Sequence, residues 1–189
     1  MENMKAVQVH NYGGPEVLRF EDAPRPTPEF GELLIKVHAA SVNAIDWKAR
    51  AGYLKDVFPL PLPYIPGWDV SGIVEAIGPG VTQFKKGDQV YVVPDGARSG
   101  KGTYAEYVVV KETEAALKPK SIDHIHAAAI PLVALTAWQA LLKQGPEGSD
   151  SWRSRRRGQH RGATRKMEGS PCDRDSVGEE SSASARIGS

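Results

Sequence analysis

The residues that could bind a metal ion are few and far apart. The chain has a single cysteine, Cys172, and five histidines. A structural zinc site needs closely spaced cysteines, and a catalytic zinc site needs Cys and His ligands with one position left open. His124 and His126 are two residues apart on a predicted helix, so their side chains point to different faces. The sequence therefore predicts no metal site, and both histidines are interpreted as solvated or capping residues.

Glycine turns that could hold a phosphate are also missing. A dinucleotide needs a strand, a glycine-rich turn and a helix N-terminus whose free N–H groups contact the pyrophosphate. Gly78-Pro79-Gly80 is followed by loop and strand, and its proline has no N–H to donate. Gly13-Gly14-Pro15 fails in the same way. The sequence predicts no Rossmann domain in this chain.

Three kinds of polar side chain remain as candidates, each with a plain structural alternative. Asn43 and Asp46 are three residues apart and could simply hydrogen-bond within their own loop. Thr136, inside an apolar helix, could donate back to the carbonyl of Leu132. Tyr53 and Tyr64 could form an aromatic wall for a flat substrate, or pack in the core. The residues alone leave each alternative open.

The elements that would position these residues are mostly strands. Alternating or β-branched runs separated by Gly and Pro turns predict several short strands and no helical period before residue 121 except in one loop. The predicted strands are Met4–His10, Val17–Glu21, Glu32–Ala40, Val70–Ile77, Gln89–Val93, Gly102–Val110 and a short one at Ala115–Lys118. Gly72 should give its strand a bend or a close backbone approach. Together they indicate a small, strongly curved sheet or barrel.

Helices are predicted at two places. Ser41–Gly52 is a loop or a short helix. Later, Ser121 or Asp123 caps a helix that begins at His124, and Pro131 either kinks it or starts a second helix. The segment Ala127–Leu142 is apolar on nearly every side, so it needs cover from more than one direction. Without that cover, we expect self-association through the exposed helix.

Composition excludes several classes of partner. The net charge of the 189 residues is +1, which gives no global electrostatic case for nucleic acid or an anionic membrane. No apolar run reaches the length of a membrane span. The N-terminus, MENMKAVQVH, has no signal-peptide pattern, and one cysteine allows no internal disulfide. We expect a cytoplasmic protein with no membrane partner and no nucleic-acid partner.

Four blocks of sequence resemble one family, in the same order. They read ASVNAIDWKARAG, PGWDVSGIVEAIGPGVTQFKKGDQVY, GTYAEYVVV and AAAIPLVALTAWQALL. This pattern resembles the medium-chain dehydrogenase/reductase superfamily, in its zinc-free, quinone oxidoreductase-like branch. The resemblance covers residues 4 to 143. It implies a mainly β, GroES-like barrel at residues 1–120 as the substrate-side domain, followed by a linking helix at 121–145.

The resemblance also implies an activity. Members of this branch reduce quinones or enones by hydride transfer from NADPH. By resemblance, Asn43, Asp46, Leu132 and Thr136 lie at positions that contact or shape the cofactor site, and Tyr53 and Tyr64 at the substrate cleft. Trp68 stands where the zinc enzymes of the superfamily have a ligand histidine, and Ala44 lies near their ligand cysteine. Both departures indicate a protein without zinc.

The last part of the chain departs from the family. Residues 146–189 are rich in Arg, Ser and Gly and show no hydrophobic period, so we expect them to be disordered. The family has a strand and a glycine-rich turn shortly after the helix, and here that place holds GPEGSDSWRSRRRGQHRGATRKM. A reading-frame shift near Gly145–Asp150, a genuine alternative C-terminus and a basic arm for RNA are the three interpretations.

Two functions follow from these alternatives. The first is a fragment of an NADPH-dependent oxidoreductase that is inactive as given and binds no cofactor tightly. The second is a non-catalytic GroES-like binding module with a basic, disordered tail.

Overall fold

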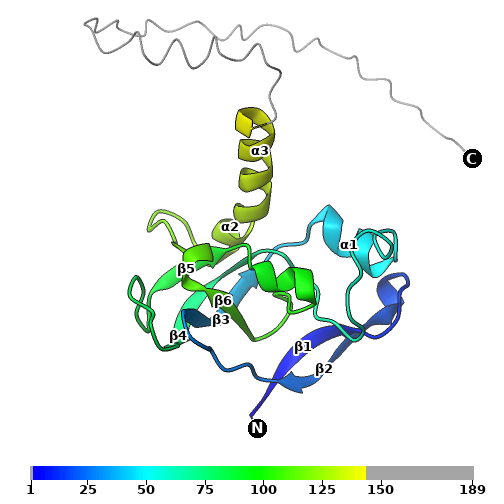
Figure 1. Ribbon diagram of the computed structural model, residues 1–189, viewed down its shortest axis with the longest axis horizontal. Coiled ribbons are helices and arrows are strands. Elements are labelled where there is room, and N and C mark those ends of the chain that lie inside the picture. The colour runs from blue at the N-terminus through cyan, green and yellow to red at the C-terminus, as the bar shows by residue number, and fades with distance from the viewer. Residues whose placement is uncertain (1, 144–189) are drawn as a thin grey trace, which may run out of the picture. The chain divides into compact units, whose positions relative to one another are not determined.

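A computed structural model describes residues 2–143, which form a mainly β domain ending in two helices (Figure 1). The strands are β1 (Asn3–Val9), β2 (Leu18–Pro24), β3 (Glu32–Ala40), β4 (Val70–Ile77), β5 (Gln89–Val92), β6 (Tyr107–Lys111) and β7 (Ala116–Leu117). The α-helices are α1 (Ala44–Arg50), α2 (His124–Ala128) and α3 (Pro131–Lys143). Short 3-10 helices are η1 (Pro15–Val17), η2 (Asp95–Ser99) and η3 (Glu112–Glu114). The predicted mainly β fold followed by a helix is confirmed.

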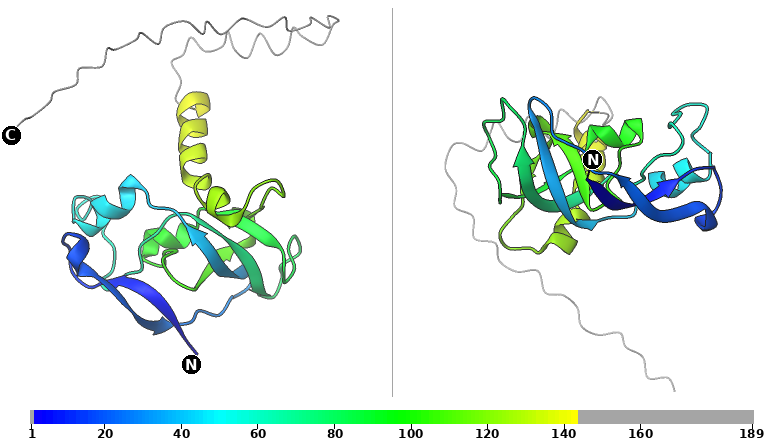
Figure 2. Two further views of the ribbon diagram at one scale, coloured as in Figure 1. Left: turned by 180° about the vertical axis from the view of Figure 1, so that it is seen from behind. Right: turned by 90° about the horizontal axis from the view of Figure 1, so that it is seen from below.

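The strands form two antiparallel sheets. The larger has the order β6-β3-β4-β5-β7, and the smaller pairs β1 with β2. Ala6 of β1 bridges Ala105, just before β6, so the pair lies against the end of the larger sheet (Figure 2). The long connections between strands carry the polar candidates that the sequence singled out.

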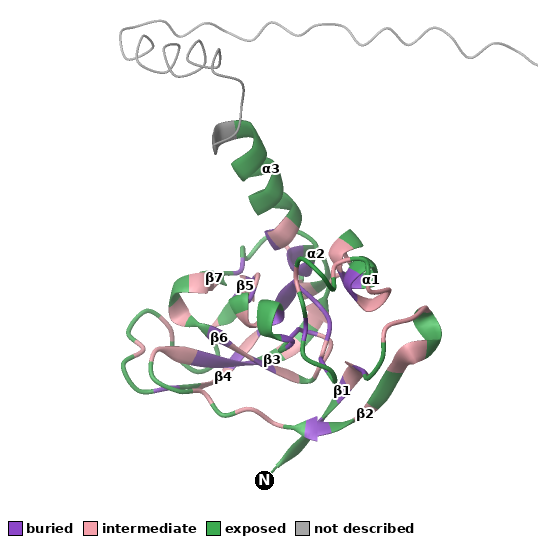
Figure 3. Cartoon of the chain, turned by 45° about the vertical axis from the view of Figure 1, so that its right-hand side comes forward, coloured by how far each residue is buried: buried purple, intermediate pink, exposed green. Residues whose placement is uncertain are grey.

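The main core lies on the inner face of the five-stranded sheet. Alternate residues of β3, β4, β5 and β6 point inward, as the period of two requires. The buried members are Leu33, Ile35, Val70, Val74, Val90, Val92, Val108 and Val110. These buried stretches stand out in purple along the sheet in Figure 3.

Gly72 allows β3 and β4 to approach closely. A Cβ at this position would lie 2.2 Å from the carbonyl oxygen of Lys36, which is far too close for two backbones to adjust cheaply. The β3–β4 register shifts twice along the pair, between Leu34 and Ile35 and again between Val37 and Ala39. The predicted close backbone approach is confirmed, and the shifts bend β3 as bulges do.

Two predicted strands begin later than the sequence indicated. Gly102–Tyr104 bonds to the Ile65–Gly67 segment instead of joining the sheet, so β6 begins only at Tyr107. Likewise Pro15–Val17 forms a 3-10 turn, because proline fits the first helical position, and β2 begins at Leu18. Ser41–Gly52, left open between loop and helix, contains α1.

The C-terminal helical segment is two helices, with Pro131 as the first residue of the second. Asp123 is the N-cap of α2, because its carboxylate accepts the N–H of His126 at 2.8 Å. Ser121 does not have this role.

From Val133 to Leu141 every residue of α3 is exposed, and Figure 3 shows the helix leaving the sheet in green. Within the described residues, no helix is long and apolar enough to cross a membrane. Residues 146–189, for which the sequence predicts disorder, lie outside the residues that the structure describes.

Candidate functional site

A fully buried carboxylate, Asp69, joins three distant parts of the domain. Its Oδ2 accepts the Ser41 hydroxyl at 2.6 Å and the Asn43 side-chain amide at 2.8 Å. Its Oδ1 accepts the backbone N–H of Leu132 at 2.8 Å. A buried charge is tolerated only when it is well hydrogen-bonded, and this one has three donors. Asp69 therefore fixes the end of β3, the start of α1 and the start of α3 relative to one another.

Asn43 and Asp46 form the start of α1. Asn43 is the N-cap, and its backbone N–H donates to Oδ2 of Asp46 at 2.7 Å. The other oxygen of Asp46 accepts the N–H of Gly67 at 3.1 Å. Burial raises the pKa of the Asp46 carboxyl, while the two N–H donors act in the opposite direction. The two residues hold the loop in shape with bonds inside the domain.

Leu132 and Thr136 lie one helical turn apart on α3. The Thr136 hydroxyl donates to the carbonyl oxygen of Leu132 at 2.7 Å, which is the back-bond that the sequence left open. Thr136 is exposed and Leu132 is half-buried beside Asp69. α3 therefore joins the Asp69 network through the Leu132 N–H, and Thr136 follows one turn further along the helix.

The two tyrosines lie in different environments. Tyr64 is 3% exposed in a second core cluster with Val9, Ala49 and Leu60. Its hydroxyl has no hydrogen-bond partner within the described residues, and burial raises its pKa to about 12. Tyr53 is 73% exposed and meets the edge of Trp47 at 5.9 Å. Tyr64 is thus a packed core residue, and only Tyr53 presents its ring at the surface.

Trp68 stands where, by resemblance, the zinc enzymes of the superfamily have a ligand histidine. It is buried, and its ring centre lies 5.7 Å from that of Phe58. The guanidinium carbon of Arg98 lies 5.8 Å from the Trp68 ring centre. Residues 2–143 contain no group of three or more His, Cys, Asp or Glu side chains able to hold a metal ion. The absence of zinc from the protein stays a prediction.

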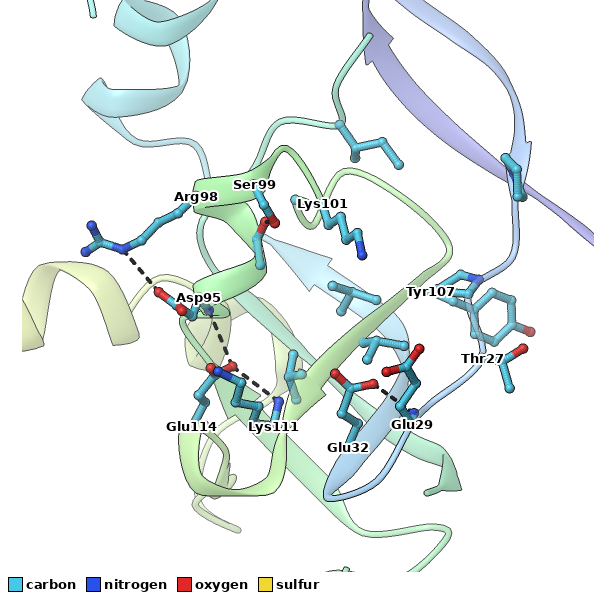
Figure 4. Close-up of a pocket in the computed structure, with 18 of the residues that line it drawn as sticks. Thr27, Glu29, Glu32, Asp95, Arg98, Ser99, Lys101, Tyr107, Lys111 and Glu114 are labelled. Carbon is cyan, nitrogen blue, oxygen red and sulfur yellow. Dashed lines mark hydrogen bonds and ion pairs between the residues drawn. The ribbon is translucent and has the colours of Figure 1, made fainter. Parts of the chain in front are cut away.

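One cavity within residues 2–143 is separate from this network. It has a volume of about 610 Å³ and lies beside β6, with η2 on one side and the β2–β3 connection on the other. Figure 4 shows Lys101 entering from one side and Glu29 and Glu32 from the other. None of the six residues predicted from the sequence lines it. Arg98 is paired with Asp95 at 3.2 Å, so part of its charge is already neutralised.

Sequence reasoning missed Asp69 and Ser41. The available signal was a carboxylate in GWDVSG, directly before the predicted strand Val70–Ile77. A charge at such a position needs partners, and one of them, Asn43, was already among the polar candidates. Its third partner is a backbone N–H, which no residue type reveals.

Comparisons with known proteins agree with this architecture. The alcohol dehydrogenase GroES-like domain family matches residues 29–120. The quinone oxidoreductase of Sus scrofa is 43% identical over 140 residues, which are 74% of this chain and 41% of that protein. The NADPH-dependent alkenal/one oxidoreductase, chloroplastic, of Arabidopsis thaliana is 42% identical over 147 residues, 75% of this chain and 38% of that protein.

A solved structure gives the same result. The quinone oxidoreductase from Coxiella burnetii superposes with a TM-score of 0.68 at 36% identity, covering 75% of this chain and 45% of that one. The chain spans about two fifths of the length of the curated relatives it matches. Residues 29–120 match the alcohol dehydrogenase GroES-like domain, and over about three quarters of its length the chain is similar to quinone oxidoreductases.

Proposed function

We propose that this domain provides the substrate side of an NADPH-dependent reductase that acts on a quinone or an enone. Two relatives support the proposal by their names, one a quinone oxidoreductase and the other an NADPH-dependent alkenal/one oxidoreductase. The reaction is hydride transfer to an electrophilic carbon, and a bound nicotinamide supplies the hydride. The protein contributes orientation and exclusion of water.

The Asp69 network is the observation that carries the proposal. It connects Asn43 directly to the start of α3, where Leu132 and Thr136 lie. The polar groups of Asn43 and Asp46 form hydrogen bonds to other groups of the same domain, so these two residues act as positioning residues. Leu132 and the exposed Thr136 hydroxyl are the groups left to meet a nicotinamide ring. A flat substrate would lie against the exposed ring of Tyr53. The buried Tyr64 belongs to the core cluster against which Leu54, the residue after Tyr53, packs.

For residues 1–189 by themselves the proposal is narrower. They hold the substrate side at 1–120 and a linking helical segment at 121–145, and they neither bind NADPH tightly nor turn over alone. The glycine turns support this, since neither Gly13-Gly14-Pro15 nor Gly78-Pro79-Gly80 is followed directly by an α-helix that could hold a pyrophosphate. A cytoplasmic setting is also part of the proposal, although the Arabidopsis relative is named chloroplastic. The exposed α3 makes a second copy of the chain the expected partner.

The test begins with the coding DNA, translated in all frames downstream of codon 145. We expect another frame to encode an apolar strand, a glycine-rich turn and a helix. The protein read in that frame should then oxidise NADPH in the presence of a quinone or an enone, followed by loss of nicotinamide absorbance. Absence of such a frame, together with salt-sensitive RNA binding that is lost on deleting 150–189, would instead support the binding module.

A further inference from the structure

Two histidine rings are stacked between the sheet and α2. His38 lies on β3 and His124 is the first residue of α2, and their ring centres are 4.6 Å apart at an angle of 30°. Nδ1 of His124 lies 2.8 Å from the hydroxyl of Ser71, which is fully buried on β4. The same hydroxyl lies 3.2 Å from the carbonyl oxygen of Val90 on β5. His124 thus joins α2 to three strands of the larger sheet.

The ionisable groups around His124 are mostly basic. β3 contributes His38, and Lys118, which follows β7, is largely buried. The Lys118 ammonium donates to the backbone carbonyls of Pro119 at 3.0 Å and of Ile122. On the side of β4 and β5, the hydrogen-bonding groups are neutral: the Ser71 hydroxyl and the backbone carbonyl of Val90.

Asp123 is the one acidic group that acts on His124 among the described residues. The Asp123 carboxylate already interacts with His126. Its Oδ1 accepts the backbone N–H of His126 at 2.8 Å and lies 2.7 Å from Nδ1 of the same residue. A proton added to His124 would therefore create a cation that faces His38 and Lys118 with little compensation. Partial burial, followed by His38 and Lys118, lowers the pKa of His124.

The sign of the pH dependence follows from that direction. Because the imidazole is harder to protonate in the folded state, its contribution to stability is complete above the ordinary histidine pKa. That contribution is lost as the pH falls through the ordinary value toward the lowered value of the folded state. Below both values, no further loss comes from His124.

We propose that the His38–His124 stack is a pH-sensitive clasp, which holds α2 against the sheet near neutral pH and opens as the solution is acidified to about pH 5–6. Only Ala129 and Ile130 separate α2 from α3. Opening the clasp therefore also loosens the start of α3, where Leu132 bonds to Asp69. The clasp does not depend on the proposed enzymatic function.

Amide hydrogen exchange of the full 189-residue chain at two pH values tests the clasp. The probe is the amide of Ala127 in α2, which donates to the Asp123 carbonyl at 3.0 Å. After correction for intrinsic exchange, its protection should fall between pH 7.5 and 5.5 by about tenfold for each unit by which the pKa of His124 is lowered. The amide of Val74, which donates to Asp88 within the sheet region, should keep its protection and serves as the internal reference.

Two variants separate the stack from a general effect of acid. His38→Gln removes one exposed ring and should reduce the pH effect at Ala127, because a cation on His124 then meets one fewer basic neighbour. His10→Gln, which removes a ring that pairs with Glu21 of β2 and has no contact with the clasp, should leave the effect in place. The proposal is overturned if Ala127 is equally protected at both pH values, or if His38→Gln retains the full pH effect.

Discussion

The interior of the five-stranded sheet and the helix α3 are both apolar, yet they differ in how far they are covered. Ile35, Val70 and Val74 are fully buried inside the sheet. In α3, Trp138 is 64% exposed and Leu141 is 72% exposed. The sheet therefore obtains its stability from contacts within residues 2–143. The apolar surface of α3 has no such cover within that part of the chain, so it is suited to contact another surface.

The largest difference between the two regions should appear on truncating one apolar side chain in each. Ile35→Ala leaves a cavity in the main core and should lower the free energy of unfolding by about 2–5 kcal/mol. Leu141→Ala removes an exposed side chain and should change it by about 0.5 kcal/mol or less. Urea unfolding of both variants measures the comparison, and equal effects would show that α3 is covered in solution.

The connection between the two regions runs through Asp69. Asp69→Ala leaves the Ser41 hydroxyl, the Asn43 amide and the Leu132 N–H without their acceptor, and should cost about 1.5–3 kcal/mol. The loss should be accompanied by faster exchange of the Leu132 amide. Asp95→Ala, which removes the exposed partner of Arg98, is the matched control and should have little effect. An unchanged Leu132 amide in Asp69→Ala would contradict the role of Asp69 as the anchor of α3.

The exposed face of α3 should also cause self-association. Trp138→Lys combined with Leu141→Lys should shift the chain toward monomer in sedimentation velocity, because it places charge on the apolar surface. Phe20→Lys is the control, since Phe20 is equally exposed, at 73%, but lies on β2. If the wild-type chain is monomeric at high concentration, this prediction is wrong.

The smallest effect is expected at Thr136. Its hydroxyl bonds only within α3 and is exposed, so Thr136→Val should change the unfolding free energy by about 0.5 kcal/mol or less. A loss several times larger, measured by urea unfolding, would mean that the hydroxyl has a further partner.

The sequence predicted the parts of the fold that depend on local pattern. The bounds of β3 and β4 were predicted correctly, because alternation marks β3 after Gly31 and glycines lie on both sides of β4. The back-bond of Thr136 was one of two stated alternatives, since a helix offers a hydroxyl few acceptors. Such features are fixed by residues within one turn or one strand.

The parts that the sequence could not predict depend on distant partners. Asp69 bonds to Ser41, 28 residues away, and to the Leu132 N–H, 63 residues away. The stack of His38 on His124 likewise forms only once α2 lies on β3, so the interpretation of His124 from the sequence did not include this partner. The burial of Tyr64, as opposed to the exposure of Tyr53, also depends on the packing of β1 and α1 around it. No periodicity in the chain contains this information.

Titration of the 189-residue chain with NADPH, followed by nicotinamide fluorescence, tests the central claim most directly. The chain is proposed to carry the substrate side of a quinone oxidoreductase-like reductase without binding the cofactor tightly by itself. We predict no saturable change in fluorescence across the micromolar range. Saturable micromolar binding would contradict the claim and would place a nucleotide site within these 189 residues.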